Sequence, residues 1–181
     1  PGGWQKKRVD LELDTVAGDG RFSGYASIFG AVDLGRDVIE PGAFAECLGK
    51  RRPSEIRMLF QHDPDQPIGR WTKIREDGRG LFVEGKLALA TARGREVHEL
   101  MKSGAVDGLS IGFRTVRAAR KGSDGIRRIL AADLWEISVV TFPMQPGARV
   151  TSVKHLTGHL AGRAGLVAAI RRATRTLAER H

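Results

Sequence analysis

Ser110 lies between two glycines in the stretch Gly108-Leu109-Ser110-Ile111-Gly112, and this spacing suits a nucleophile. Flanking glycines let a substrate backbone approach to attack distance, although they weaken a strand. Strand alternation places Ser110 on the face opposite Leu109 and Ile111, away from the apolar side. An ordinary strand serine beside a bulge has the same pattern, so spacing alone leaves both interpretations open.

His62 is the candidate base that would take the proton of a serine hydroxyl, because histidine titrates near neutral pH. It ends the apolar run 56–61, so one ring edge can pack while the other stays reachable. A purely structural histidine is the alternative. We expect His98 on the exposed side of a helix. His155 and His159 have the spacing of a metal pair, but no third ligand is near, so we expect no metal site.

Glu136 stands in the middle of the most apolar run of the chain, residues 134–141. A buried carboxylate needs a partner, which can be a structural cation or a histidine ring that it orients. Asp133, just outside the run and on the opposite face, is the rival acid. Ser138 shares the face of Glu136 and is a candidate polar neighbour. These residue types are those of a nucleophile, a base and an orienting acid, and a structural role for each stays open as the alternative.

Two other readings of the glycine-rich stretches are excluded. The segment 108–112 formally matches the Gly-x-Ser-x-Gly pattern of hydrolase elbows, but residues 113–117 continue as a strand where an elbow requires a helix. Neither this segment nor residues 78–81 ends in the Lys-Ser/Thr of a phosphate loop. We therefore expect no cofactor.

The elements that must position these side chains are mostly strands, because alternation with period two dominates the chain. Strands are expected at 9–13, 21–28, 56–62, 68–74, 81–89, 108–117 and 126–141, a turn at 63–65, and helices at 41–48, 91–102 and 160–177. This order predicts an α+β fold built on a mostly antiparallel, closed or nearly closed β-barrel surrounded by a few helices.

Composition fits one globular domain: the 181 residues are 41% hydrophobic and 28% charged. Cys47 is the only cysteine, which excludes an internal disulfide and a cysteine-based zinc site. No apolar run is long enough for a membrane span, and residues 1–8 lack the apolar core of a secretion signal. We expect a soluble intracellular protein with no membrane partner.

The net charge of +9 is concentrated near the end of the chain. Beyond Arg149, Glu179 is the only acid opposite the cations Lys154, Arg163, Arg171, Arg172, Arg175 and Arg180. We therefore divide the chain into a domain at 1–150 and a basic helical tail at 151–181. The tail can be a solvated helix, or it can bind an acidic scaffold protein or nucleic acid. An aromatic content of 6% argues against a nucleic-acid partner.

Several stretches taken together resemble the prohead proteases of tailed phages, a family similar in fold to the herpesvirus assembly proteases. The stretches that carry the resemblance are Gly24-Tyr25-Ala26, Ile39 to Phe44, Leu59 to Asp63, Gly108 to Phe113 and Leu134 to Val140. Their order and spacing across residues 20–150 resemble the family, and the tail lies outside the match.

The resemblance implies a herpesvirus-protease-like fold and a serine endopeptidase with Ser110 as nucleophile, His62 as base and Glu136 in the position of the third member. It implies cleavage of capsid or scaffold proteins, and of itself, during phage prohead maturation. The implied substrate is the scaffold segment of the major capsid protein or a separate scaffolding protein, and self-association is expected. The implied location is the assembling procapsid in the host bacterial cytoplasm. A catalytically inactive capsid-assembly or scaffold-binding protein is the alternative.

Overall fold

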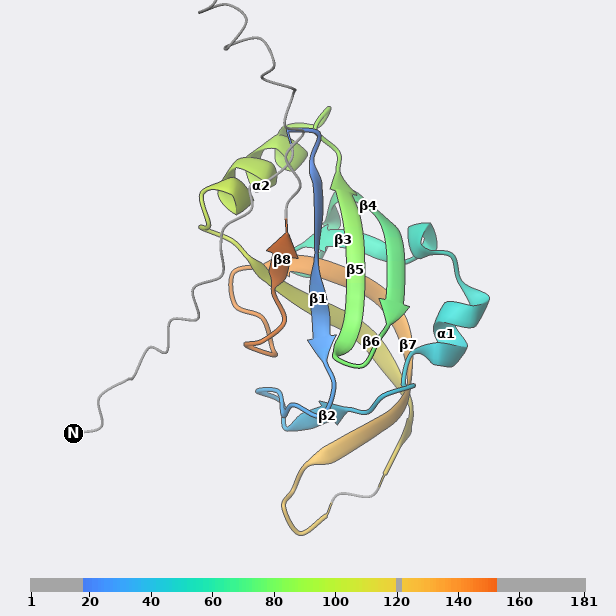
Figure 1. Ribbon diagram of the computed structural model, residues 1–181. Coiled ribbons are helices and arrows are strands. Elements are labelled where there is room, and N and C mark those ends of the chain that lie inside the picture. The colour runs from blue at the N-terminus through green and yellow to red at the C-terminus, as the bar shows by residue number, and fades with distance from the viewer. Residues whose placement is uncertain (1–17, 120–121, 153–181) are drawn as a thin grey trace, which may run out of the picture.

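The computed structural model describes residues 18–119 and 122–152. One eight-stranded sheet curls around a core, with two short α-helices outside it (Figure 1). In chain order the elements are β1 Arg21–Ile28, β2 Asp37–Ile39, α1 Ala45–Lys50, the 3-10 turn η1 Pro53–Glu55, β3 Arg57–Phe60, β4 Asp63–Glu76, β5 Gly80–Leu87, α2 Ala92–Lys102, β6 Gly108–Ala118, β7 Arg127–Val140 and β8 Val150–Ser152. Among the described residues, no helix has the length and hydropathy needed to cross a membrane.

The sheet is mixed, so the prediction of a mostly antiparallel barrel holds only in part. β7 pairs in parallel with β2 and with β3, which lie one after the other along the same edge of β7. The remaining neighbours, including the long β6–β7 hairpin, are antiparallel. A parallel pair needs a long connection between its strands, and residues 61–126 provide one between β3 and β7. Alternation alone carries no information about strand direction.

The strands pair in the order β8-β1-β5-β4-β3-β7-β6, and the curl brings the chain beside β8 against β6. β8 pairs with β1, and Arg149 forms an isolated bridge with Gly108 at the start of β6. The backbone N–H of Leu109 donates to Ala148 O at 2.9 Å, which fixes the same junction. A Cβ at Gly24 of β1 would lie 2.4 Å from Arg149 O, so only glycine lets the chain approach this closely. The start of β6 is thereby held by β7 on one side and by the Arg149 segment on the other.

The core lies inside the curled sheet and is filled by side chains from β1, β4, β6, β7 and the segment before α1. Trp71 of β4 is 1% exposed and packs edge to face on Phe22 of β1, with ring centroids 5.5 Å apart. Phe44, which precedes α1, and Leu109 and Leu134 of the β6–β7 hairpin are fully buried. Burial of each such side chain stabilises the fold by about 1.5 to 3 kcal/mol. This core supports the strands that carry the polar residues of the candidate site.

Most predicted elements are present. The strand at 21–28, the hairpin of β4 and β5, the helix near 91–102 and the β6–β7 hairpin are confirmed. The turn predicted at 63–65 is wrong, because β4 begins at Asp63 and the chain reverses one step earlier. The helix predicted at 41–48 starts only at Ala45 and runs to Lys50.

Some predictions fall on residues that the structure does not describe. The strand at 9–13 and the helix at 160–177 both lie outside the described residues, as does the basic tail beyond Ser152. The last described strand, β8, was not predicted. It consists of three residues and is defined by its pairing with β1, so a local pattern gives too little information to find it.

Candidate active site

The turn between β3 and β4 consists of Gln61 and His62, since Phe60 pairs directly with Asp63. Both turn residues have positive φ, 57° and 61°, as a tight hairpin turn of the type I′ class requires. This conformation is unfavourable for residues other than glycine. Two bonds to β7 hold it in place: Gln61 N donates to Val139 O at 3.0 Å, and His62 N donates to the hydroxyl of Ser138 at 3.1 Å.

The ring of His62 meets Glu136, which comes from the middle of β7. Nδ1 of the ring lies 2.7 Å from Glu136 Oε1, and the Ser138 hydroxyl donates to the other carboxylate oxygen at 2.6 Å. The Glu136 side chain is only 14% exposed. The hydrogen bond to Glu136 raises the pKa of His62 above its ordinary 6.5, with partial burial working in the opposite direction. With Nδ1 held by a carboxylate, Nε2 is the ring nitrogen left to accept a proton.

Ser110 of β6 lies directly opposite Ser138 of β7 in the antiparallel ladder. Residues opposite each other point to the same face, with Cβ atoms about 4.5 to 5.5 Å apart. Because Glu136 is two residues from Ser138 on β7, it shares this face as well. The structure thus brings all three predicted site residues to one region of the sheet. Within the described residues, no hydrogen bond joins Ser110 to His62.

The Ser110 residue is 3% exposed, yet its hydroxyl is not sealed inside the protein. Among the described residues, no buried side-chain nitrogen or oxygen lacks a hydrogen-bond partner. The Ser110 hydroxyl has no partner there, so its oxygen must reach the solvent-accessible surface. A hydroxyl without a partner in the protein is free to donate its proton to a base.

Gly112 has a role that sequence spacing did not predict. A Cβ at this position would lie 2.2 Å from Oε1 of Glu136, the oxygen that contacts His62. The absence of a side chain on β6 therefore leaves room for the carboxylate on β7. Spacing had suggested that the flanking glycines serve substrate approach, whereas the geometry relates this one to the placement of the acid.

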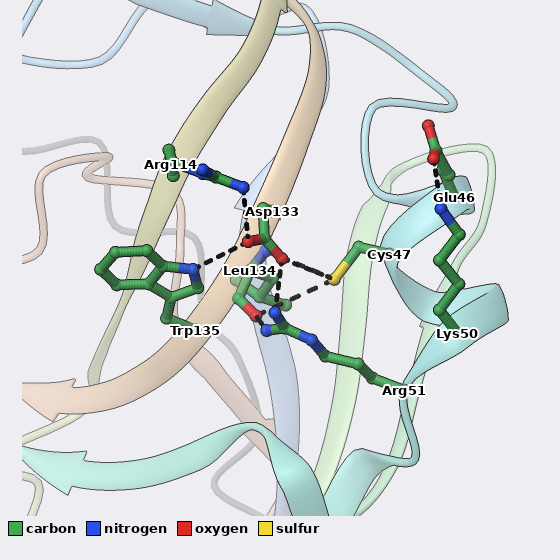
Figure 2. Close-up of polar contacts among 8 residues, drawn as sticks. All are labelled: Glu46, Cys47, Lys50, Arg51, Arg114, Asp133, Leu134 and Trp135. Carbon is green, nitrogen blue, oxygen red and sulfur yellow. Dashed lines mark hydrogen bonds and ion pairs between the residues drawn. The ribbon is translucent and has the colours of Figure 1, made fainter.

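Asp133, the rival acid, belongs to a separate cluster near α1 (Figure 2). Its carboxylate accepts a hydrogen bond from Trp135 Nε1 at 3.0 Å and forms ion pairs with Arg51 at 2.9 Å and Arg114 at 3.4 Å. The hydrogen bond from Trp135 lowers the pKa of Asp133, partial burial opposes this, and the two guanidinium groups reinforce the lowering. Glu136, and not Asp133, is the acid in contact with the His62 ring.

Comparison with known proteins shows to which family the chain belongs. The model of the caudovirus prohead serine protease family matches residues 7–160. The chain belongs to this family. It is 34% identical over 147 residues to the prohead protease of Enterobacteria phage HK97, covering 78% of this chain and 64% of that protein. It is 29% identical over 151 residues to the prohead protease of Escherichia phage T5, covering 82% and 70% of the two chains. The chain thus spans just under two thirds of the HK97 relative.

Solved structures with low sequence identity can be compared with this prohead protease family member in their fold alone. The capsid assembly protease of bacteriophage T4 superposes with a TM-score of 0.56 at 10% identity, covering 66% of this chain and 80% of that one. This likeness shows a shared fold. The protease of KSHV, a herpesvirus, has a TM-score of 0.49 at 12% identity over 72% and 63% of the two chains.

The prediction that His98 lies on the exposed side of its helix is wrong, because it is 6% exposed. The buried positions of α2 are Gly94, Val97, His98 and Met101, which recur at helical spacing and form a single stripe. Leu100, next to this stripe on the same helix, is exposed. The remaining histidine candidates, His155 and His159, lie outside the described residues.

Gln145 is a buried polar residue near the site that sequence reasoning missed. Its side-chain oxygen accepts from Ile28 N at 2.6 Å, and its nitrogen donates to Ile28 O at 2.8 Å and Ala31 O at 3.1 Å. These bonds fasten the loop after β7 to the end of β1. Glutamine is common on protein surfaces, so nothing in the local pattern identifies this one as a structural clamp.

Proposed function

We propose that this prohead protease family member is a serine endopeptidase that cleaves capsid or scaffold proteins, and itself, during maturation of the phage prohead. The observation that carries the proposal is the 2.7 Å contact of His62 Nδ1 with Glu136, on the sheet face to which Ser110 also belongs. This is the arrangement in which a carboxylate orients an imidazole beside a hydroxyl. Family membership adds independent support.

In the proposed mechanism, Nε2 of His62 removes the hydroxyl proton of Ser110, and the oxygen attacks the carbonyl carbon of the scissile peptide bond. The tetrahedral intermediate collapses when the imidazolium gives its proton to the leaving amine, which produces an acyl-enzyme. Water, deprotonated by the same nitrogen, then releases the acyl product. Glu136 keeps the proton on Nδ1 throughout and stabilises the imidazolium. Hydrogen bonds of this kind commonly tighten only when substrate binds.

The negative charge on the substrate oxygen requires donors, and we propose backbone amides of the loop 143–149 or next to Ser110 for this role. The loop is held close to the nucleophile because Leu109 N donates to Ala148 O at 2.9 Å. Gln145 fastens its other part to β1. Fixed amides of this kind stabilise charge that develops in the transition state without reorganising, which is the largest contribution in many acyl-transfer enzymes.

The proposed substrate is the scaffold segment of the major capsid protein or a separate scaffolding protein, cleaved inside the assembling procapsid in the host cytoplasm, with the protease self-associating there. Two relatives are named prohead proteases. A third, the capsid polyprotein of Pseudomonas phage PAJU2, is 34% identical over 131 residues, which cover 68% of this chain and 19% of that one. These names support a role in capsid assembly.

The test is co-expression of the chain with the neighbouring capsid gene, followed by mass spectrometry of new protein termini. We expect Ser110→Ala to reduce the cleavage rate by roughly 10⁴- to 10⁶-fold while the protein still folds. Ser123→Ala, in the exposed turn between β6 and β7, is the matched control and should cleave at the normal rate. Continued trimming of the capsid protein by the Ser110→Ala variant would overturn the proposal.

A further inference from the structure

Ser110 also lines a pocket of about 250 Å³. Its walls come from β1, the turn 33–37, β2, β6, the start of β7 and the loop after β7. Six of the lining residues are apolar, namely Ala26, Ile39, Leu109, Ile111, Phe113 and Met144. Under the proposed mechanism, a space beside the nucleophile must receive a substrate side chain adjacent to the bond that is cut.

The charged groups that line this pocket are two carboxylates and one guanidinium, so they leave an excess of one negative charge. Arg127 donates from Nε to Asp37 Oδ1 at 2.8 Å and from a second nitrogen to the other oxygen, so these two residues form a bidentate pair. Asp33, the other carboxylate, forms no ion pair within the part of the chain that the structure describes. The pKa of Arg127 is raised chiefly by its hydrogen bond to Asp37 and to a smaller extent by the charge of Asp33, so one guanidinium faces two carboxylates. The net charge of the lining is therefore that of one carboxylate, since the bidentate pair is neutral.

The Asp33 carboxylate is held by its own turn. Oδ1 accepts from Asp37 N at 2.8 Å, while the backbone of Asp33 donates to Asp37 O at 2.9 Å and accepts from Arg36 N at 3.1 Å. Leu34 N donates to Met144 O at 2.9 Å, which joins the turn to the opposite wall of the pocket. The charge is consequently preorganised rather than carried on a mobile side chain, and one of its oxygens stays available.

We propose that this pocket binds the lysine or arginine side chain of the substrate residue whose carbonyl carbon Ser110 attacks, with Asp33 as the specificity determinant. The inference rests on the proposed function. The apolar walls suit the methylene stem of a long basic side chain, and the carboxylate pairs with its cationic head. The side chain of the attacked residue is the natural occupant, because it stays next to Ser110 through the acyl-enzyme stage. An acidic side chain would face repulsion from Asp33.

The first test is digestion of a library of peptides of mixed sequence, with the new termini mapped by mass spectrometry. We expect the wild-type protein to cut after lysine or arginine. In Asp33→Asn, which keeps an oxygen for the Asp37 amide, we expect the kcat/KM ratio of a lysine peptide over its norleucine analogue to fall at least 10-fold. Glu96→Gln on α2 removes an equal charge away from the pocket and should leave that ratio unchanged. A wild-type enzyme without basic preference, or an unchanged ratio in Asp33→Asn, would overturn the inference.

The second test does not need catalysis, so it separates the pocket from the proposed function. Butylguanidinium, a butyl chain ending in a guanidinium, is titrated into the Ser110→Ala protein and followed by NMR. We expect its dissociation constant to rise at least 10-fold when Asp33→Asn is added, and the weak binding of uncharged butylurea to stay the same. Equal butylguanidinium affinity in both proteins would refute the basic pocket. A wild-type protein that cleaves nothing, yet binds butylguanidinium through Asp33, would instead refute the proposed peptidase activity alone.

Discussion

Glu136 uses its two oxygens for two different elements. One oxygen contacts the ring of His62 in the β3–β4 turn, and the other accepts a hydrogen bond from Ser138 on its own strand. A largely buried carboxylate with both oxygens in hydrogen bonds has a defined orientation, so it can fix which ring nitrogen of the histidine carries the proton. The residue-scale predictions concern this carboxylate and the space around it.

The first prediction concerns the titration of His62. Because Glu136 raises its pKa above 6.5, we expect the His62 ring signal in NMR to titrate above that value, and Glu136→Gln to move the midpoint to lower pH. The base works when neutral, so kcat/KM should rise with pH and its midpoint should shift in the same direction. By linkage, the contact stabilises the fold below the unfolded pKa and loses its effect as pH rises through the folded one. An identical midpoint in both proteins would contradict the assignment.

The second prediction concerns the space opposite Glu136. A methyl group at position 112 would displace the end of a flexible side chain, so we expect Gly112→Ala to fold, to bring the His62 pKa back toward 6.5 and to cut proteolysis at least 100-fold. Gly49→Ala is the matched control. It lies exposed in α1 with no atom near its would-be Cβ, and it should raise the free energy of unfolding by up to about 1 kcal/mol with normal activity.

At the residue scale, alternation placed Glu136 and Asp133 on opposite faces of one strand but left open which of the two contacts the histidine. In the structure Glu136 contacts the His62 ring, while the catalytic roles stay predictions. The space at Gly112 and the hydrogen bonds of Gln145 could not be predicted from the sequence. Both depend on atoms from a strand or loop that is distant in sequence, and no local pattern reports such contacts.

At the scale of elements, the β3–β4 hairpin decides where His62 lies. The sequence predicted a turn at Asp63-Pro64-Asp65, since these residue types favour turns. The chain instead reverses at Gln61 and His62, because bonds from both residues to β7 hold the tight turn there. Tertiary contacts thus override local turn preference, which is why the position of the reversal could not be predicted.

The third prediction tests how β7 holds this turn. Ser138 is fully buried, and removing its hydroxyl leaves His62 N and one Glu136 oxygen without a partner. We expect Ser138→Ala to lower the free energy of unfolding by about 1 to 3 kcal/mol in urea titration and to broaden the His62 signal. Ser103→Ala, which loses one exposed bond at the end of α2, is the control and should cost less than about 1 kcal/mol. Equal costs would mean that the Ser138 hydroxyl does not hold the turn.

At the scale of the whole molecule, the fold depends on contacts between distant segments. β7 is paired with β2, β3 and β6, whose residues come from well separated parts of the chain. The sequence indicated the number and spacing of strands well enough to suggest a barrel-like sheet with outer helices. It did not reveal the parallel pairings, because strand direction is decided by long connections and core packing.

The fourth prediction concerns the core inside the curl. Trp71 is 1% exposed and packs against Phe22, so Trp71→Ala should lower the free energy of unfolding by about 3 to 5 kcal/mol. Trp135 is 55% exposed on β7, and Trp135→Phe should change stability by no more than about 1 kcal/mol. Chemical denaturation followed by circular dichroism compares the two. A small loss for Trp71→Ala would show that the sheet does not depend on this packing.

The left-handed backbone of Gln61 and His62 has a consequence for engineering. Holding residues other than glycine in this conformation costs roughly 1 to 2 kcal/mol each. Glycine or asparagine at position 62 would relieve that cost, so a screen for heat resistance alone would favour them. Under the proposed function, the variants selected in this way would be stable but inactive, because they lack the base. Thermostable variants of this family member should therefore be selected on activity from the first round.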